Sequence, residues 1–563
     1  MRTDVIVVGA GAAGLAAALA AHARGLDVAV LEKEPRFGGT SALSGAAIWI
    51  PLHDGHGSGD TPEAVLAYLD ALAPDPADRA RREAFVANAA KALAFYQERT
   101  ALAYAPRKVA PDYHPDLPGA SVTGRVLDVE TYDGRRLGRR LRDLRAPLET
   151  HLVFGGMMVN RADVATLLRF GRERGATLGG LRLIGRYLRD RLAGHGRGTR
   201  LVVGSALVAR LAETLFAQDI PLLLDTPARS LIRSTDGRIS GVMAGQDGAL
   251  RPIEARRAVI LASGGFPGDA HRSRSERADP EAPHLSMASS AAAGDGATMA
   301  EAVGGGLGPV GKGAFFRAPV SLHRPPGRPP RRFAHLTLDR AKPGVIAVDR
   351  TGRRFTNEAD SYHRFGEALS QLPAAGPDAP VAWLIADARA LRRYGLGLAR
   401  PAPAHHGNRR LIRDGYLIQA PDIAALAARL GLPPGALAGT IAAHGRAAAA
   451  GRDPEFGKGE GPHNRALGDP GAGPNPCLAP LAEPPFSAVG LLSGDLGTAR
   501  GLMTDAAARV LDGAGRPIPG LYAAGNDMQS IMGGTYPGPG ITLGPALVFA
   551  WLAAIHIAEE DPA

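Results

Sequence analysis

The N-terminal segment reads VIVVGAGAAG over residues 5–14, and a second apolar run, VAVL, follows at residues 28–31. The first run is rich in β-branched residues, as is typical of a buried strand in a parallel sheet, and the Ala- and Leu-rich stretch after it predicts a helix. In such a unit Gly9 permits a tight turn, Gly11 lets a pyrophosphate approach the backbone, and Gly14 lets the helix pack on the strand. The segment therefore predicts a dinucleotide-binding βαβ unit.

An acidic residue in the expected place separates this segment from a chance match. Glu32 directly follows the second run, 18 residues beyond the last glycine, where a carboxylate can accept hydrogen bonds from the adenosine ribose. The same glycine spacing recurs at Gly306, Gly308 and Gly311, but that match follows a helical stretch, contains Pro309 and leads into no crossover unit. We interpret the second match as a loop, and we expect no separate nicotinamide site.

Small and hydroxyl residues after the second run favour FAD over NAD. GGTS at 38–41 and SG at 44–45 allow backbone and hydroxyl groups to line a pyrophosphate and a flavin. Two distant apolar segments, 258–265 and 520–526, also end in small-residue turns, which fits a chain that returns twice to one flavin-binding sheet. The predicted cofactor-binding residues are Gly9, Gly11, Ala13, Gly14, Glu32, Lys33, Gly38, Gly39, Thr40, Ser41, Ser44, Gly45, Ala228, Ala262, Ser263, Gly264, Gly525, Asn526, Thr542 and Leu543.

Length and composition indicate a large folded enzyme. The chain has 563 residues, more than the roughly 250–300 at which a single core stops growing, so at least two compact units are expected. Cys477 is the single cysteine, which excludes intrachain disulfides and Cys-ligated iron–sulfur clusters. Electrons leaving a flavin must therefore pass to an external acceptor, and no metal site is predicted.

The net charge of +10 comes almost wholly from arginine. Basic residues are scattered, aromatic residues make up only 5% of the chain, and no nucleic-acid-binding motif occurs, so no nucleic-acid partner is expected. The densest basic run spans residues 135–145, and it fits either a solvated helical face or peripheral association with a membrane. The apolar N-terminus is explained by the glycine motif rather than by a signal peptide. Since Pro545 interrupts the apolar segment 541–558, a cytoplasmic protein is expected.

Three segments carry a family resemblance: the N-terminal region through GGTSALSG at 38–45, GRRFTNE at 352–358, and GGTYPGPGITLGP at 533–545. They resemble the fumarate reductase/succinate dehydrogenase flavoprotein superfamily and, within it, the 3-ketosteroid Δ1-dehydrogenases. The resemblance implies an α/β fold in which an α+β catalytic domain is inserted into a Rossmann-type, glutathione-reductase-like FAD-binding domain. The implied boundaries are 1–275 and 480–563 for the FAD-binding domain and 276–479 for the catalytic domain.

The resemblance also implies the groups that act on the substrate. Tyr536 and the backbone N–H of Gly540 would bind the oxygen of a ketone, and Tyr362 matches the catalytic tyrosine. Desaturation beside a ketone requires removal of an α proton, which is feasible only if hydrogen-bond donors stabilise the enolate. We therefore expect an FAD-dependent dehydrogenase that desaturates a C–C bond α,β to a ketone, most closely like a 3-ketosteroid Δ1-dehydrogenase with a small apolar ketone as substrate.

A base made from tyrosine needs support, because a tyrosine side chain ordinarily titrates near 10. Tyr113 resembles the supporting tyrosine, with Tyr104 and Tyr132 as alternatives. A nearby cation such as Arg353 or Arg354 would lower the pKa of Tyr362, and the sequence leaves open which cation faces it. A helix is expected to start near Thr542, where its N-terminus would oppose negative charge on a reduced flavin.

Two other functions compete with ketone dehydrogenation. A fumarate-type reductase would need cationic clamps for a dicarboxylate, but the chain has no Lys or Arg after Arg516, and His556 is the one remaining candidate there. A non-catalytic flavin electron carrier would leave the long inserted domain unexplained. Both are less favoured than the ketone dehydrogenase.

Overall fold

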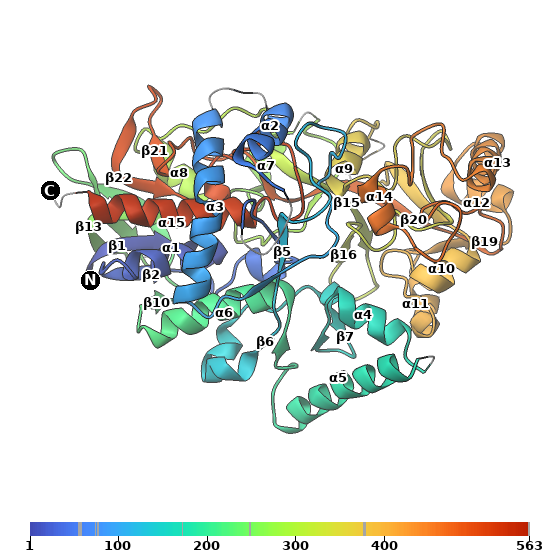
Figure 1. Cartoon of the computed structure of the whole chain (residues 1–563), viewed down its shortest axis with the longest axis horizontal. Coiled ribbons are helices and arrows are strands. Elements are labelled where there is room, and N and C mark those ends of the chain that lie inside the picture. The colour runs from blue at the N-terminus through green and yellow to red at the C-terminus, as the bar shows by residue number, and fades with distance from the viewer. Residues whose placement is uncertain are drawn as a thin grey trace.

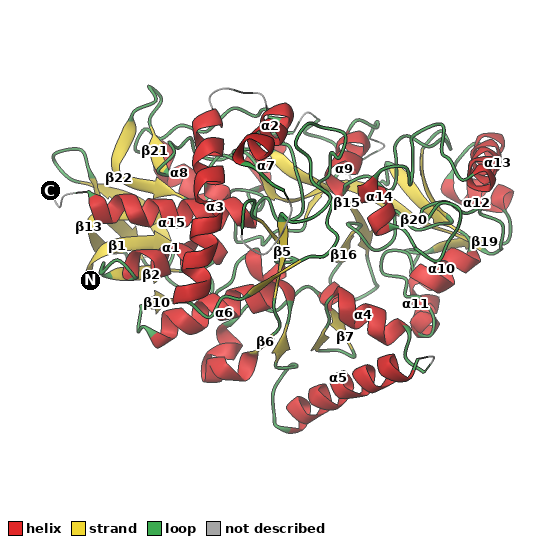
Figure 2. Ribbon diagram, in the orientation of Figure 1, coloured by secondary structure: helices red, strands yellow, loops and turns green. Residues whose placement is uncertain are grey.

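A computed structural model describes residues 1–53, 59–73, 75, 78–171, 173–246, 249–277, 279–374, 376 and 379–560. Two sheets dominate the described residues, and Figure 1 shows them side by side along the long axis of the molecule. Helices cover both sheets, as the ribbon coloured by secondary structure makes clear (Figure 2).

The first sheet is the predicted dinucleotide-binding sheet. Its strands are β1 (Arg2–Val8), β2 (Val28–Leu31), β10 (Leu222–Leu223), β11 (Ala228–Arg233), β12 (Ile239–Ala244), β13 (Arg251–Leu261), β21 (Arg509–Leu511) and β22 (Pro517–Ala523). β1 lies between β2 and β13 and is parallel to both, and β22 is parallel to β13. Because parallel strands end at the same edge of a sheet, the turns after these four strands meet there.

Helices pack against this sheet and against each other in one continuous core. They are α1 (Ala12–His22), α3 (Arg79–Arg99), α6 (Val203–Ala217) and α15 (Leu543–Glu559). α1 contains almost only Ala, Leu and Gly, and ten of its eleven residues are buried. Its small side chains allow α15 to lie close beside it, and α15 begins at Leu543 as the sequence indicates.

The second sheet forms the core of the inserted region. Its strands are β14 (His284–Ser286), β15 (Phe315–His323), β16 (Arg331–Ala334), β17 (Val345–Asp349), β18 (Ala382–Ala386), β19 (Ile418–Ala420) and β20 (Phe486–Thr498). Alternate residues of β17 enter different clusters, Val345 and Ala347 on one face and Ile346 and Val348 on the other. The sheet is therefore buried on both faces. The helices around it are α9 (Tyr362–Ser370), α10 (Ala388–Tyr394), α11 (Asn408–Arg413), α12 (Ile423–Leu430), α13 (Pro434–Ala450) and α14 (Pro462–Leu467).

Smaller elements lie around and between the two sheets. They are α2 (Pro62–Leu72), α4 (Arg161–Leu168), α5 (Arg174–Leu192), α7 (Ala270–Ser275), α8 (Asp295–Glu301), the 3₁₀ helix η3 (Gly134–Asp143), and the strands β3 (Ile48–Trp49), β4 (Tyr104–Pro106), β5 (Val126–Val129), β6 (Tyr132–Asp133), β7 (Leu152–Val153), β8 (Met157–Met158) and β9 (Arg200–Leu201). Among the described residues, no helix combines the length and the apolar character needed to cross a bilayer.

The fold bears on two further predictions. The second glycine match, at Gly306, Gly308 and Gly311, lies in a loop as predicted. The domain boundaries stay a prediction, but strand pairing differs from them at one end: the boundary at 480 assigns β20 to the FAD-binding domain, whereas β20 pairs with strands of the second sheet. A run of 13 mostly buried residues fits either sheet, so its partners could not be read from its own sequence.

Candidate active site

The glycines of the first turn bring α1 against the end of β1. Gly9 has φ +110°, and a Cβ built on it would lie 2.3 Å from the carbonyl oxygen of Ala262. A Cβ on Gly14 would lie 1.9 Å from the oxygen of Gly9. A Cβ built on Gly11 would meet no atom closer than Ser41 Oγ at 3.6 Å, so space remains beside its backbone. The contacts of Gly9 and Gly14 fit a tight turn and close packing of the helix on the strand, and the approach of a pyrophosphate at Gly11 stays a prediction.

Glu32 stabilises the same turn from the end of β2. Its carboxylate accepts hydrogen bonds from the backbone N–H groups of Ala10 and Glu34, both at 3.0 Å, and burial raises its pKa. Each carboxylate oxygen keeps a further lone pair for a ribose hydroxyl. Lys33, the next residue, forms an ion pair with Asp295 at the start of α8. Lys33 therefore links the turn to the chain beyond β13.

Hydroxyl groups order the segment that carries Gly38 and Gly39. Ser41 Oγ accepts a hydrogen bond from the N–H of Ala12 at 3.0 Å, which satisfies one of the free donors at the start of α1. Thr40 Oγ1 accepts from the N–H of Ser289 at 3.0 Å, and Ser44 Oγ donates to the oxygen of Ser41 at 2.8 Å. Gly45 is exposed and has open space beside it.

Asp527 joins the turns after β13 and β22, and it is absent from the predicted residues. Its carboxylate accepts from the N–H groups of Ser263 and Gly265 and from Ser263 Oγ, and burial raises its pKa. Gly525 precedes it with φ +66°, and a Cβ there would lie 2.9 Å from Ala13 Cβ. Asn526, between them, is partly open. An acid directly after Gly525-Asn526 was the available signal for Asp527.

A cavity lies where these turns meet the start of α15. It is lined by residues that include Gly525, Asn526, Thr498, Ile541, Thr542 and Phe316. Ala262 and Gly264 lie in the neighbouring turn after β13, and Leu543 opens α15, while Ala228 starts the adjoining strand β11. Small residues, free backbone groups and a helix N-terminus suit a pyrophosphate and a flavin. The residues present therefore fit FAD.

Three tyrosines from distant segments meet beyond this cavity. The ring of Tyr113 lies 5.6 Å from that of Tyr362 and 5.7 Å from that of Tyr536, and the rings of Tyr362 and Tyr536 are 5.3 Å apart. Tyr362 also interacts through its hydroxyl with both other tyrosines. All three are buried, with 2–7% of their surfaces exposed. Tyr104 and Tyr132 are buried elsewhere, and their hydroxyls have no hydrogen-bond partner among the described residues.

Burial governs the acidity of the three tyrosines. It raises the pKa of Tyr362 well above the ordinary value, and it also raises the pKa values of Tyr113 and Tyr536. The cations that oppose this effect are Arg107 and Arg340, whose charges lower the pKa of Tyr113. Arg107 is itself held by Asp128, with Nε at 2.9 Å from a carboxylate oxygen. The positive charges that would stabilise a tyrosinate therefore act on this cluster through Tyr113.

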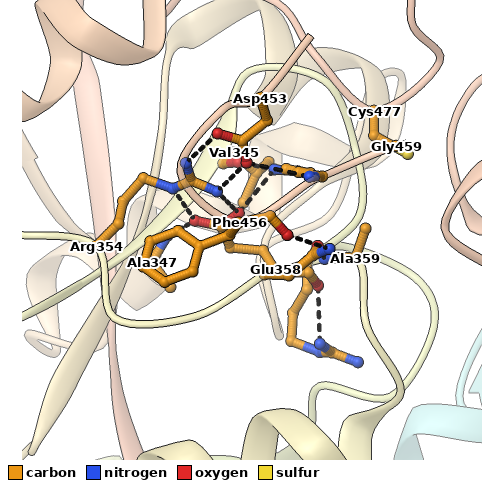
Figure 3. Close-up of polar contacts among 12 residues, drawn as sticks. Val345, Ala347, Arg354, Glu358, Ala359, Asp453, Phe456, Gly459 and Cys477 are labelled. Carbon is orange, nitrogen blue, oxygen red and sulfur yellow. Dashed lines mark hydrogen bonds and ion pairs between the residues drawn. The ribbon is translucent and has the colours of Figure 1, made fainter. Parts of the chain in front are cut away.

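The prediction that Arg353 or Arg354 serves as this cation is wrong. Arg353 is exposed. Arg354 is buried in an ion network, with both Glu358 and Asp453 within 3.0 Å of its guanidinium, as Figure 3 shows. A buried arginine pairs first with the carboxylates that lie closest to it, and Glu358 is only four residues away in the sequence. Sequence spacing placed these arginines near Tyr362 but could not identify their partners.

The Tyr-Pro-Gly-Pro-Gly segment is fixed by a polar cluster that the sequence did not indicate. The N–H of Tyr113 donates to the oxygen of Pro537 at 2.8 Å. Trp49 Nε1 donates to Asp112 at 2.9 Å, and Arg125 donates to the same carboxylate at 2.7 Å. A Cβ on Gly538 would lie 2.9 Å from the Trp49 ring. The pair Asp112 and Arg125 thus holds Tyr113 against the segment that carries Tyr536.

Gly540 ends this segment in the left-handed region. It has φ +95°, and a Cβ there would lie 2.5 Å from the oxygen of Ala47, so only glycine fits without a shift. Its N–H donates to no acceptor among the described residues, while its oxygen accepts from Trp49 at 3.2 Å. This N–H therefore remains for a ligand, while the hydroxyl of Tyr536, which interacts with Tyr362 and Thr542, stays a predicted second donor. His556 on α15, by contrast, forms a hydrogen bond through its Nδ1 with the hydroxyl of Tyr522 on β22 at 2.8 Å.

Comparison with known proteins identifies the family. The family model described as FAD binding domain matches residues 4–543. The chain belongs to this FAD-binding family. FAD is therefore its cofactor, as predicted.

Full-length relatives of this FAD-binding chain include a 4-oxocyclohex-2-ene-1-carboxylate 5-dehydrogenase of Sinomonas cyclohexanicum, 36% identical over 99% of this chain and 94% of the relative. A 3-oxosteroid 1-dehydrogenase of Mycobacterium tuberculosis is 34% identical over 99% of this chain and 98% of the relative. Among solved structures, a 3-ketosteroid Δ1-dehydrogenase of Sterolibacterium denitrificans in complex with 1,4-androstadiene-3,17-dione has a TM-score of 0.91, with 34% identity and 99% of each chain covered.

These findings confirm the predicted resemblance and fold class. The FAD-binding chain is an oxidoreductase of the kind that acts on CH–CH groups, as its sequence predicts. The roles of individual site residues stay predictions, and so do the cytoplasmic location and the external electron acceptor.

Proposed function

We propose that this enzyme desaturates the C–C bond α,β to the ketone of a cyclic substrate, most closely in the manner of 3-ketosteroid Δ1-dehydrogenation. The observation that carries the proposal is the convergence of Tyr113, Tyr362 and Tyr536 in one buried cluster. Gly540, four residues beyond Tyr536, adds an N–H that has no acceptor in the described part of the chain. Such a cluster supplies hydrogen-bond donors for an enolate and a phenol to exchange a proton, while burial excludes water.

In the proposed reaction, Tyr536 Oη and the N–H of Gly540 donate hydrogen bonds to the carbonyl oxygen of the substrate. They stabilise the negative charge that develops there as the α C–H bond breaks, each contributing about 100–1,000-fold in rate. Tyr362 Oη takes the α proton, and the electron pair of that bond forms the new C=C bond. When bound, FAD supplies the acceptor for the hydride that leaves the β carbon.

Tyr113 supports Tyr362 rather than touching the substrate. Its ring contacts both other tyrosines, and the charges of Arg107 and Arg340 favour its ionised form. A hydrogen bond between the hydroxyls of Tyr113 and Tyr362 couples the two phenols. The charges of Arg107 and Arg340 thus oppose the effect of burial at Tyr113, the neighbour of Tyr362.

Two classes of ketone deserve comparison as substrates. Relatives of similar identity are named for steroid ketones and for a monocyclic oxo-carboxylate, so both ring sizes are candidates for this chain. The direction proposed is oxidation of the ketone, with electrons passed to an acceptor outside the chain.

Anaerobic reduction of the bound flavin tests the proposal. The holoenzyme is mixed without oxygen with a 3-keto-4-ene steroid, with 4-oxocyclohex-2-ene-1-carboxylate, or with succinate, and the visible flavin band is followed by stopped flow. We expect a ketone to bleach the flavin and succinate to leave it oxidised. Bleaching by succinate together with no response to either ketone would reject ketone dehydrogenation in favour of dicarboxylate chemistry.

A further inference from the structure

Helix α5 has two apolar faces, of which only one packs on the protein. Ala176, Gly180 and Tyr187 are buried, and Tyr187 clusters with Met157 and Val159 of the β7–β8 region. Tyr187 Oη also donates to the oxygen of Phe154 at 3.1 Å. These contacts fix the orientation of the helix, so its opposite face must point away from the protein.

The outward face carries four leucines. Leu178, Leu181, Leu188 and Leu192 have 51%, 54%, 54% and 89% of their surfaces exposed. Their spacings of three, seven and four residues place them in one stripe along the helix. Figure 1 shows α5 at the lower edge of the molecule, apart from both large sheets. An exposed stripe of large apolar side chains on a protruding helix is typical of a docking surface.

The charged residues of α5 are almost all basic. Arg174, Arg182, Arg189 and Arg191 are exposed, whereas the one acid of the helix, Asp190, is buried and accepts hydrogen bonds from Thr199. Arg174, Arg182 and Arg189 form no ion pair among the described residues. Arg182 and Arg189 lie on one flank of the leucine stripe, by their helical spacing.

The basic run at 135–145 is different in this respect. Four of its six arginines, Arg135, Arg136, Arg140 and Arg145, pair with Asp133, Glu213, Asp143 and Glu34, whereas Arg139 and Arg142 form no ion pair among the described residues. Carboxylates of the protein therefore neutralise most of the charge of these four arginines, which fits the interpretation of the run as a solvated surface. Unmatched positive charge beside exposed leucines is found instead on α5.

We propose that the outward face of α5 docks on the surface of an anionic lipid bilayer. The helix lies in the plane of the interface, with its leucines in the boundary between headgroups and acyl chains and its arginines on lipid phosphates. A Leu-rich face flanked by arginine is the pattern of interfacial helices. A second copy of this chain is a poor partner, because two such faces would bring their unpaired arginines together. The proposal does not depend on the proposed reaction.

Vesicle flotation of the holoenzyme tests this surface. The probes are vesicles of phosphatidylcholine alone and of phosphatidylcholine with phosphatidylglycerol. We expect the protein to float with anionic vesicles and to bind neutral ones at least tenfold more weakly. The variants L181E/L188E and R182E/R189E should each lose at least tenfold in binding to anionic vesicles.

The matched control for L181E/L188E is L250E/V310E. It also replaces two exposed apolar residues by glutamate, but outside α5. It should bind like the wild type. Flavin absorbance and ketone oxidation with a soluble dye acceptor should stay unchanged in all variants, which separates loss of docking from loss of folding. Equal flotation of L181E/L188E and the wild type, or no flotation of the wild type, overturns the proposal. A concentration-dependent dimer that L181E/L188E abolishes, seen by sedimentation without vesicle binding, assigns the face to a second copy instead.

Discussion

Tyr536 and Tyr362 are predicted to divide the work at the substrate ketone. Tyr536→Phe removes one of two donors to the carbonyl oxygen, so flavin reduction should slow by about 100–1,000-fold while substrate binding changes less. Tyr362→Phe removes the base, so exchange of the substrate's α hydrogens with solvent should stop, whereas Tyr536→Phe should only slow it. Deuterium incorporation measured by mass spectrometry distinguishes the two. Exchange at the wild-type rate in Tyr362→Phe would move the base to another residue, with Tyr113 the first to examine.

Arg107 is predicted to set the pH dependence of the same step. Burial raises the pKa of Tyr362, so the rate of flavin reduction should rise with pH through the alkaline range as the tyrosinate becomes populated. The charge of Arg107 lowers the pKa of Tyr113, so Arg107→Gln should shift this rise to higher pH and reduce the rate at neutral pH. Arg353→Gln is the control, because Arg353 is exposed. An unchanged profile in Arg107→Gln together with a shifted one in Arg353→Gln would reverse the assignment of the cation.

At the scale of elements, the close packing of α1 on β1 is predicted to limit FAD binding. In Gly14→Ala the new methyl group would lie 1.9 Å from the oxygen of Gly9, so the helix must shift away from the turn that faces the pyrophosphate. We expect loss of most bound FAD and a destabilisation of about 1–3 kcal/mol. Gly175→Ala on α5 has open space and should have neither effect. Flavin content after gel filtration and thermal melting measure both, and full FAD retention by Gly14→Ala would contradict the expected role.

The same scale explains how much could be predicted from the sequence. The βαβ unit, the start of α15 and the two return strands could be predicted because each is encoded by a short continuous pattern. Asp112 could not, since it acts through Trp49, 63 residues away, and through Arg125, and no spacing rule connects the three. Arg354 was misassigned for the related reason that ion pairs in a buried network depend on segments such as the one carrying Asp453, 99 residues further on.

At the scale of the whole molecule, FAD is predicted to stabilise the fold. The residues that fit it come from the first 45 residues, from the turn after β13 and from the chain beyond β22, so one ligand contacts segments far apart in sequence. Free FAD at 100 times its dissociation constant should stabilise the protein by about 2.7 kcal/mol. Thermal melting of deflavinated protein with added FAD measures this, and FMN is the control because it lacks the adenosine that Glu32 would hold. Equal increases in melting temperature with FAD and FMN would argue against binding of the adenosine by Glu32.

Strand β20 connects the two halves of the molecule more directly than any loop. It pairs with β15 on one side and β18 on the other, and its last residue, Thr498, lines the cavity beside Asn526. A strand held on both sides opens only when much of its sheet opens with it. Its amide hydrogens should therefore exchange with solvent deuterium as slowly as those of β1, and the protection should continue along the strand to the wall of the flavin cavity. Slow exchange at both ends would mean that the flavin cavity and the centre of the second sheet unfold as one cooperative unit.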